Sequence, residues 1–377
     1  MNFFTKIDIP ESDCQIDYKS HLAFFGSCFA DNISAQFESR KFKVLANPFG
    51  TVYNPLSLAK QIMAIADGKV FNEEDVFQDM RLGNGACLKN KVSKENNVGS
   101  ENRASSENRV SNENGRDDNS AKENLNDSSE KNCAAPWHCW DAHSSLSAAS
   151  REESIAKLNA ATTQAREFLQ KADVVFITLG TSFVYFLKDG NVVSNCHRQD
   201  PRMFIRKMIS VDEAAKAIQA IVESLCKIKN DGSHIVFTVS PLRHMSDGAH
   251  SNTLSKATLQ LAIEMVVKGT TAATTPATIE YFPSYEIVMD ELRDYRFYDS
   301  DMVHLSKTAE EYIFERMTET YCDDKTRDDI KQVEKFLKMA NHRIQNADSA
   351  ATATFIQKLH AEAAKLESQI AGLRLNV

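Results

Sequence analysis

Apolar segments suited to buried strands alternate along the chain with segments whose apolar residues recur at helical spacing. The expected strands cover residues 22–25, 42–45, 173–180, 234–240 and 279–282. One expected helix begins after residue 28, and the others cover residues 56–66, 211–228, 251–267 and 306–318. Because strands and helices take turns in this way, the pattern predicts an α/β protein with three layers, α/β/α, and a mainly parallel sheet.

One region interrupts this alternation. Residues 89–132 repeat short polar units and contain almost no large apolar side chains, so they cannot bury a core. We interpret them as a disordered loop inserted into a single domain of residues 1–322, rather than as a linker between two domains. An interaction segment is the alternative.

The last part of the chain, residues 323–377, is rich in Lys, Glu, Ala and Leu and contains no proline. Its apolar residues form two helical stripes, Ile330, Val333, Phe336, Leu337 and Ala340, then Phe355, Leu359, Leu366 and Ile370. The pattern predicts a C-terminal helical hairpin with its break near residues 346–349. We expect the hairpin to pack on the body; a homodimer through these helices is the alternative.

Composition and charge narrow the class of protein. The chain has 377 residues, 42% of them hydrophobic, and a net charge of −8. Without a basic cluster to offset this charge, we expect no nucleic-acid partner and no membrane partner. No signal-peptide pattern, no apolar run of membrane-spanning length and no Cys-x-x-Cys pair among eight cysteines is present. We therefore expect a cytoplasmic protein with reduced thiols.

The first expected strand ends at a tight turn, Gly26-Ser27-Cys28, from which a helix starts. Gly26 supplies the permissive backbone that such a bend needs. A nucleophile at a helix N-terminus benefits from the helix dipole and from unpaired N–H groups, which can hold an oxyanion. The turn therefore marks Ser27 and Cys28 as candidate nucleophiles. A plain strand–turn–helix with a glycine at the bend is the alternative.

Asp301 and His304 stand three residues apart near the end of the expected α/β body. On a helical turn, both side chains would lie on one face, so that the carboxylate could orient the imidazole. Together with the turn nucleophile they would form a Ser/Cys-His-Asp arrangement, with His304 as general base and then general acid.

The string Gly-Ser-Cys-Phe-Ala at residues 26–30 is the signature of the GSCFA family, and the chain resembles that family in later blocks too. These blocks lie at residues 47–55, 140–144, 179–182, 239–244 and 301–304. The resemblance implies a flavodoxin-like fold of the SGNH/GDSL-type hydrolase superfamily. It also implies hydrolysis of an unknown small-molecule or glycan ester, without a cofactor. The alternatives are an acyltransferase acting on a glycan or other alcohol, and a binding or scaffold protein with weakened catalysis.

The resemblance also implies roles for single residues. Aligning Gly26 with the glycine of the superfamily's Gly-Asp-Ser block puts Cys28 in the nucleophile's register, whereas the superfamily's hydroxyl chemistry favours Ser27, so both stay open. Gly50 stands where the superfamily offers a backbone N–H to the oxyanion.

The third block departs from the superfamily pattern, because Gly180-Thr181-Ser182 replaces Gly-x-Asn-Asp. A hydroxyl of Thr181 or Ser182 could donate one hydrogen bond there, and Asn54 could compensate for the missing amide or serve as a turn residue.

Three further residues are expected to line the substrate site: His143, Arg243 and His244. A surface-loop position is the alternative for His244. Zinc ligation by Cys133, His138, Cys139 and His143 would need an uncommon spacing, so we expect no metal.

Overall fold

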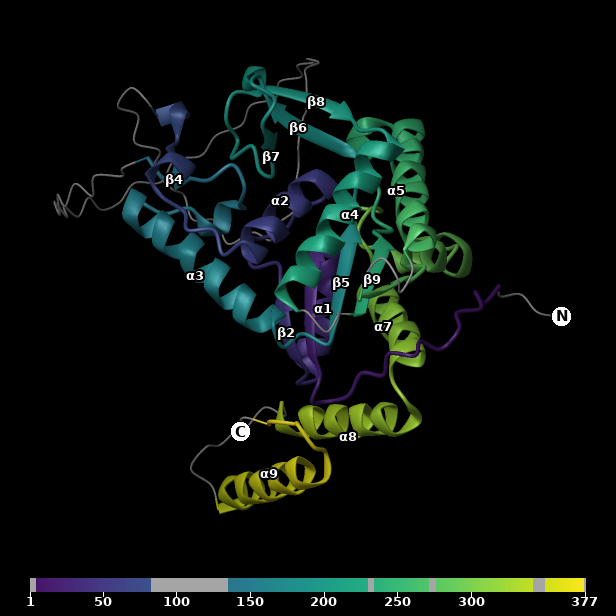
Figure 1. Cartoon of the computed structure of the whole chain (residues 1–377). Helices are drawn as coiled ribbons and strands as arrows, with labels where there is room; N and C mark the ends of the chain where they lie inside the picture. Colours follow the sequence, from purple (N-terminus) through teal and green to yellow (C-terminus); the bar gives the residue numbers. More distant parts are fainter. Residues whose placement is uncertain (1–4, 83–134, 230–233, 271–275, 342–349, 376–377) are drawn as a thin grey trace, which may run out of the picture.

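The computed structural model describes residues 5–82, 135–229, 234–270, 276–341 and 350–375. Five parallel strands form its central sheet, in the order β2-β1-β5-β9-β10 (Figure 1). These strands are β1 (His21–Gly26), β2 (Lys43–Ala46), β5 (Val174–Leu179), β9 (His234–Val239) and β10 (Thr278–Tyr281). Counted along the chain, the order is 2-1-3-4-5, which is flavodoxin-like. The predicted fold class is confirmed, and the expected insertion at residues 89–132 lies outside the described residues.

Helices cover both faces of this sheet (Figure 1). One face packs against α2 (Pro55–Ala66), α3 (Arg151–Leu169), α4 (Val211–Ile228) and α5 (Ala249–Gly269). The other face packs against α1 (Cys28–Ser39) and α7 (Lys307–Tyr321). Each face of the sheet has its own hydrophobic core, the first beneath α2, α3, α4 and α5 and the second beneath α1 and α7. Because side chains alternate along a strand, Ala23 and Phe25 of β1 join the first core, and Leu22 and Phe24 join the second.

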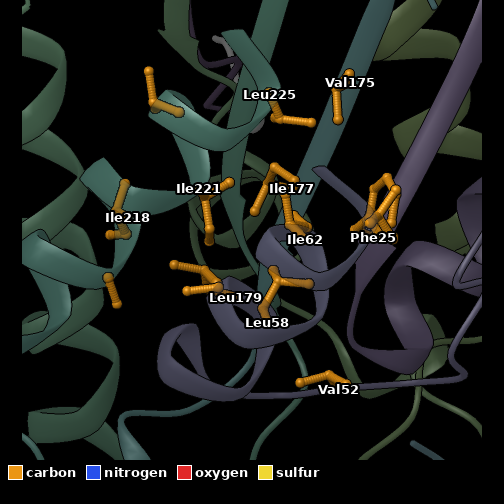
Figure 2. Close-up of a cluster of buried hydrophobic side chains, with 14 of the residues drawn as sticks. Phe25, Val52, Leu58, Ile62, Val175, Ile177, Leu179, Ile218, Ile221 and Leu225 are labelled. Carbon is orange, nitrogen blue, oxygen red and sulfur yellow. The ribbon is translucent and has the colours of Figure 1, made fainter. Parts of the chain in front are cut away.

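Figure 2 shows the first core, where strand side chains meet two helices. Val175, Ile177 and Leu179 project from β5 toward α2 and α4. The helical partners are Leu58 and Ile62 of α2 and Ile218, Ile221 and Leu225 of α4. Burial of this apolar surface fixes the helices and with them the loops at the carboxyl ends of the strands.

The C-terminal helices α8 (Asp324–Ala340) and α9 (Ala350–Gln369) pack on the body, below the sheet in Figure 1. Phe336 of α8 and Leu366 of α9 belong to the same buried cluster as the side chains of α1. An ion pair of 2.6 Å between Arg40 Nε and Glu334 Oε1 adds to this contact. The expected break near residues 346–349 is not described, and the division at residue 322 stays a prediction.

Four features were not expected from the sequence. Helix α3 begins after Ser150, whose side chain accepts a hydrogen bond from the Glu153 N–H. A small antiparallel sheet, β7-β6-β8, follows β5, and β3 pairs with β4. Their bounds are β3 (Phe77–Gln78), β4 (Trp137–His138), β6 (Phe183–Leu187), β7 (Val192–Val193) and β8 (Phe204–Met208), and a short helix α6 covers Ser284–Glu286.

Candidate active site

The turn between β1 and α1 is tightly packed against strand β5. Gly26 has a φ of +125°, and a Cβ atom there would lie 2.0 Å from the carbonyl oxygen of Thr178. The next residue donates its N–H to that same carbonyl, at 3.2 Å from Ser27 N. Only glycine fits this bend, so the strand can deliver residues 27 and 28 to the carboxyl edge of the sheet.

The two candidate nucleophiles differ in their surroundings. Ser27 is 1% exposed, and its buried Oγ has no hydrogen-bond partner among the described residues. It occupies the N-cap of α1 with its backbone alone, since its side chain makes no capping hydrogen bond. Cys28 is the first residue of α1 and is half-buried. The thiol is therefore the more accessible of the two groups.

The Cys28 thiol is protonated in the resting protein. Burial and the charge of Asp31 raise its pKa to about 11, while the N–H groups of Cys28 and Phe29 and the charge of Lys256 act in the opposite direction. Asp31 is held beside the turn by hydrogen bonds from Asn47 Nδ2 (2.6 Å) and Thr51 Oγ1 (3.0 Å). The thiol consequently needs a base before it can attack.

Lys256 of α5 is a member of the site that the sequence interpretation missed. Its side chain is buried, with 1% of the residue exposed, and its Nζ donates to the carbonyl oxygens of Gly180 and Ser240, each at 2.6 Å. Burial lowers its pKa to about 7, against a smaller raising effect of Cys28. The sequence did indicate that Lys256 is buried, because it lies three and seven residues before Leu259 and Ile263, at the spacing of one helix face, on the buried face of α5.

Asp301 and His304 form a hydrogen-bonded pair, with 2.5 Å between Asp301 Oδ2 and His304 Nδ1. The other carboxylate oxygen accepts the N–H groups of Val303 and His304, both at 2.8 Å. Slight burial acts to raise the pKa of Asp301, but these hydrogen bonds lower it to about 2. The expectation of a helical turn was wrong: the pair lies in the loop before α7, where Met302 adopts a φ of +60°.

A histidine and a tyrosine also belong to the site. His244 packs edge-on against Tyr53, with 5.7 Å between the ring centres. Burial, Lys256 and His304 lower the pKa of His244 to about 4, so its ring is neutral near pH 7. Burial and the charges of Cys28 and Asp31 raise the pKa of Tyr53 to about 12. The charge of Lys256 therefore acts on both Cys28 and His244, and the charge of His304 acts on His244.

Two expected oxyanion donors are occupied by other partners. The Gly50 N–H donates to the Asn47 carbonyl at 2.7 Å, and Asn54 caps α2, its Oδ1 2.9 Å from Ser57 N. A Cβ at Gly50 would lie 2.2 Å from the Cβ of His143, so that histidine packs on the Gly50 turn. Its Nδ1 accepts the N–H of Ser145 at 3.2 Å.

The hydroxyl groups of the third block are bonded to another side chain in the interior. Thr181 Oγ1 and Ser182 Oγ lie 3.0 and 3.1 Å from the hydroxyl of Ser255 on α5, inside the protein. Gly180 remains at the site, because a Cβ there would lie 3.4 Å from the Cβ of Ser27. Arg243 directs its Nη2 to the sulfur of Met289 at 3.0 Å.

The expected base and the expected nucleophiles do not bond to one another in the structure. In the described parts of the chain, no hydrogen bond joins His304 to the side chain of Ser27 or Cys28.

The described residues considered above as zinc ligands do not gather at one place. None of the described residues forms a cluster of three or more His, Cys, Asp or Glu side chains fit for a metal ion. His138 instead bonds to the Ser147 hydroxyl at 2.6 Å.

Comparisons with known proteins add one finding. The sequence model of the GSCFA family matches residues 21–130 and 108–317, which together cover most of the chain. No curated protein and no solved structure matches it. Among the described helices, none combines the length and apolar character needed to cross a membrane.

Proposed function

Since the chain belongs to the GSCFA family, we propose that it is an enzyme of acyl-ester chemistry whose nucleophile is the Cys28 thiol. One arrangement carries this proposal. The half-buried thiol starts a helix, its charge acts on the pKa of the buried Lys256 amine, the charges of Lys256 and His304 both act on the pKa of His244, and Asp301 orients the His304 ring. Thiol, oriented imidazole and helix N-terminus are the parts that acyl transfer needs.

In the proposed reaction, His304 takes the proton of the Cys28 thiol while the sulfur attacks the ester carbonyl carbon. The N–H groups of Cys28 and Phe29, which face the sulfur, stand at the N-terminus of α1 where developing negative charge is favoured. Expulsion of the alcohol, which receives the proton from His304, leaves a thioester on Cys28. Water or an acceptor alcohol then attacks that thioester and restores the thiol.

Two observations bear on the assignment of roles. The Ser27 hydroxyl is buried, with 1% of the residue exposed, whereas Cys28 is half-buried, and this difference in accessibility favours the thiol. Asp301 holds the Nδ1 side of the His304 ring, which leaves Nε2 to face a substrate. Catalytic hydrogen bonds commonly form only in the substrate complex, so the missing contact between His304 and Cys28 is compatible with catalysis.

A binding protein that has kept the fold is the second candidate. The observations that favour it are the occupied Gly50 N–H, the inward-facing Thr181 and Ser182, and the missing bond between base and thiol. Such a protein would hold an ester or glycan without turning it over.

The test is acyl transfer from p-nitrophenyl acetate, followed by release of nitrophenol and by the intact mass of the protein. We expect an acetyl adduct on Cys28 in the wild-type chain, and loss of turnover in Cys28→Ala. The matched control is Ser27→Ala, one residue away, which keeps turnover. His304→Ala should slow acylation by about 100-fold or more, the usual contribution of a general base. Turnover that survives Cys28→Ala but not Ser27→Ala would reassign the nucleophile, and no adduct in any variant would favour the binding protein.

A further inference from the structure

The side chain of Lys256 ties two neighbouring strands of the sheet together beyond their last ladder bond. Strands β5 and β9 pair in parallel as far as Leu179, whose carbonyl accepts the Ser240 N–H at 2.8 Å. The next carbonyls, of Gly180 and Ser240, both accept a hydrogen bond from the Lys256 Nζ, each at 2.6 Å. With 1% of the residue exposed, the amine lies inside the protein and bridges the two loops that leave the carboxyl edge of the sheet.

One of these loops supports the turn that carries the candidate nucleophiles. A Cβ atom at Gly180 would lie 3.4 Å from the Cβ of Ser27, so the Gly180 backbone lies against the Ser27 side chain. Two residues earlier, the Thr178 carbonyl accepts the Ser27 N–H at 3.2 Å. The Gly180 N–H in turn donates to the Tyr53 carbonyl at 2.7 Å. This segment therefore holds Ser27 from one side, and Lys256 fixes the carbonyl at its end.

Helix α5 bonds the same edge through two more buried side chains. Ser255 Oγ accepts the Ser182 N–H at 2.7 Å in the loop after β5. Asn252 Oδ1 accepts the His244 N–H at 3.0 Å in the loop after β9. These two residues and Lys256 are within four positions of one another, so they lie on one face of the helix. Lys256 differs from the other two, because it bonds both loops at once.

The hydrogen bonds of Lys256 leave it little to offer a substrate. A neutral amine has two N–H groups, and two carbonyl oxygens accept from this nitrogen. Burial lowers its pKa to about 7, so much of the amine is neutral near that pH. The buried nitrogen is therefore a cross-link between main-chain segments rather than a group that touches the reacting atoms.

We propose that Lys256 is a positioning residue of the candidate active site, which fixes the segment at Gly180 against Ser27 and thereby sets the place of the Cys28 thiol. Misplacement of a reacting group by about 1 Å can slow a reaction by about 100-fold, so loss of this cross-link should lower the rate of the acyl chemistry. This kinetic consequence rests on the function proposed above, whereas the positioning of the turn does not.

The experiment compares three full-length variants. Lys256→Met keeps the length of the side chain and removes both hydrogen bonds, whereas Lys256→Gln keeps an amide that can donate to a carbonyl. The matched control is Leu259→Ala, three residues further along the same buried face of α5, which weakens the helix by lost packing. All rates are measured at a temperature at which circular dichroism shows every variant to be folded.

Hydrogen exchange of the main-chain amides, followed by mass spectrometry, reports on the turn without a substrate. We expect Lys256→Met to speed exchange about tenfold or more in peptides that contain residues 26–30 and 180–182, and Lys256→Gln to speed it less. Leu259→Ala should speed exchange in α5 and leave these two segments near the wild-type rate. Wild-type exchange of both segments in Lys256→Met, or equal acceleration by Leu259→Ala, would overturn the proposal. If Lys256→Met does not fold, Lys256→Gln decides by the same criterion.

Turnover of p-nitrophenyl acetate gives the second readout. Lys256→Met should lower kcat about tenfold or more and leave KM within about twofold, because the substrate still binds while the thiol is misplaced. Leu259→Ala should keep the wild-type kcat. A wild-type chain without turnover would refute the proposed function and leave the exchange rates to decide the role of Lys256. Turnover in the wild type with an unchanged kcat in Lys256→Met would refute the positioning role alone.

Discussion

The buried amine of Lys256 makes a quantitative prediction about how stability depends on pH. Its pKa falls from an ordinary 10.5 to about 7 in the folded chain, because burial disfavours the ammonium. At about 1.36 kcal/mol per pKa unit, the charged form costs the fold about 5 kcal/mol relative to the neutral amine. Between these two pH values the unfolded chain binds one proton more than the folded one. The free energy of unfolding therefore rises with pH across this window, and the contribution is lost again as the pH falls toward 7.

The perturbation that exposes this effect is Lys256→Met, which keeps the length of the side chain and removes the amine. The variant also leaves the carbonyls of Gly180 and Ser240 without their donor, at a pH-independent cost of about 1–3 kcal/mol each. Because the charge of Cys28 is coupled to that of Lys256, both chains should carry Cys28→Ala.

Urea unfolding of the two chains at several pH values gives the measurement. From about pH 7 to pH 9, we expect the stability difference to grow by about 2 kcal/mol in favour of the chain that keeps Lys256. Lys256→Arg is the control, since a guanidinium stays charged; it should show no such gain and should be strongly destabilised. If the difference between the Lys256 and Met chains stays constant over this range, the folded chain does not release the proton and the reasoning fails.

Three more predictions concern packing and unpaired groups. Gly26→Ala should destabilise the fold by about 3 kcal/mol or more in urea unfolding, because its Cβ would collide with the Thr178 carbonyl at a φ that only glycine tolerates; a loss below about 1 kcal/mol would contradict the close approach. Ser27→Ala should raise the thermal midpoint, since it removes a buried hydroxyl with no partner, worth about 1–3 kcal/mol, and an unchanged or lower midpoint would reveal a hidden partner. Phe336→Ala should cost about 3–5 kcal/mol, and a two-state transition that shifts as a whole would show that α8 unfolds with the sheet.

Local patterns predicted the layered fold well. Helix α4 covers the residues that its apolar spacing indicates, and its start is fixed by a capping box between Ser210 and Glu213. The fully buried β5 is equally legible, because all of its residues except Thr178 are apolar. In both cases the deciding interactions lie within a few residues of one another, so the sequence contains them.

The site was less predictable, because its contacts join residues that are far apart in the chain. The spacing of Asp301 and His304 suggested a helical turn, yet the pair meets in a loop that needs a left-handed conformation at Met302. The helical spacing of Lys256 indicates its burial, but the Gly180 carbonyl that it bonds is 76 residues away, so only the assembled sheet reveals that partner. The short strands β6 and β8 were missed for a related reason, since their pairing partners are each other rather than the main sheet.

The second core joins residues that the ribosome makes at very different times. Helix α1, which begins at Cys28, shares that core with Leu373 and Leu375, which are 0% and 4% exposed. The helix therefore leaves the ribosome early, but the core that it belongs to is complete only after these two leucines have emerged. The core behind the thiol-bearing turn thus includes residues made some 345 positions later, so that a truncated product carries the signature motif without the complete core.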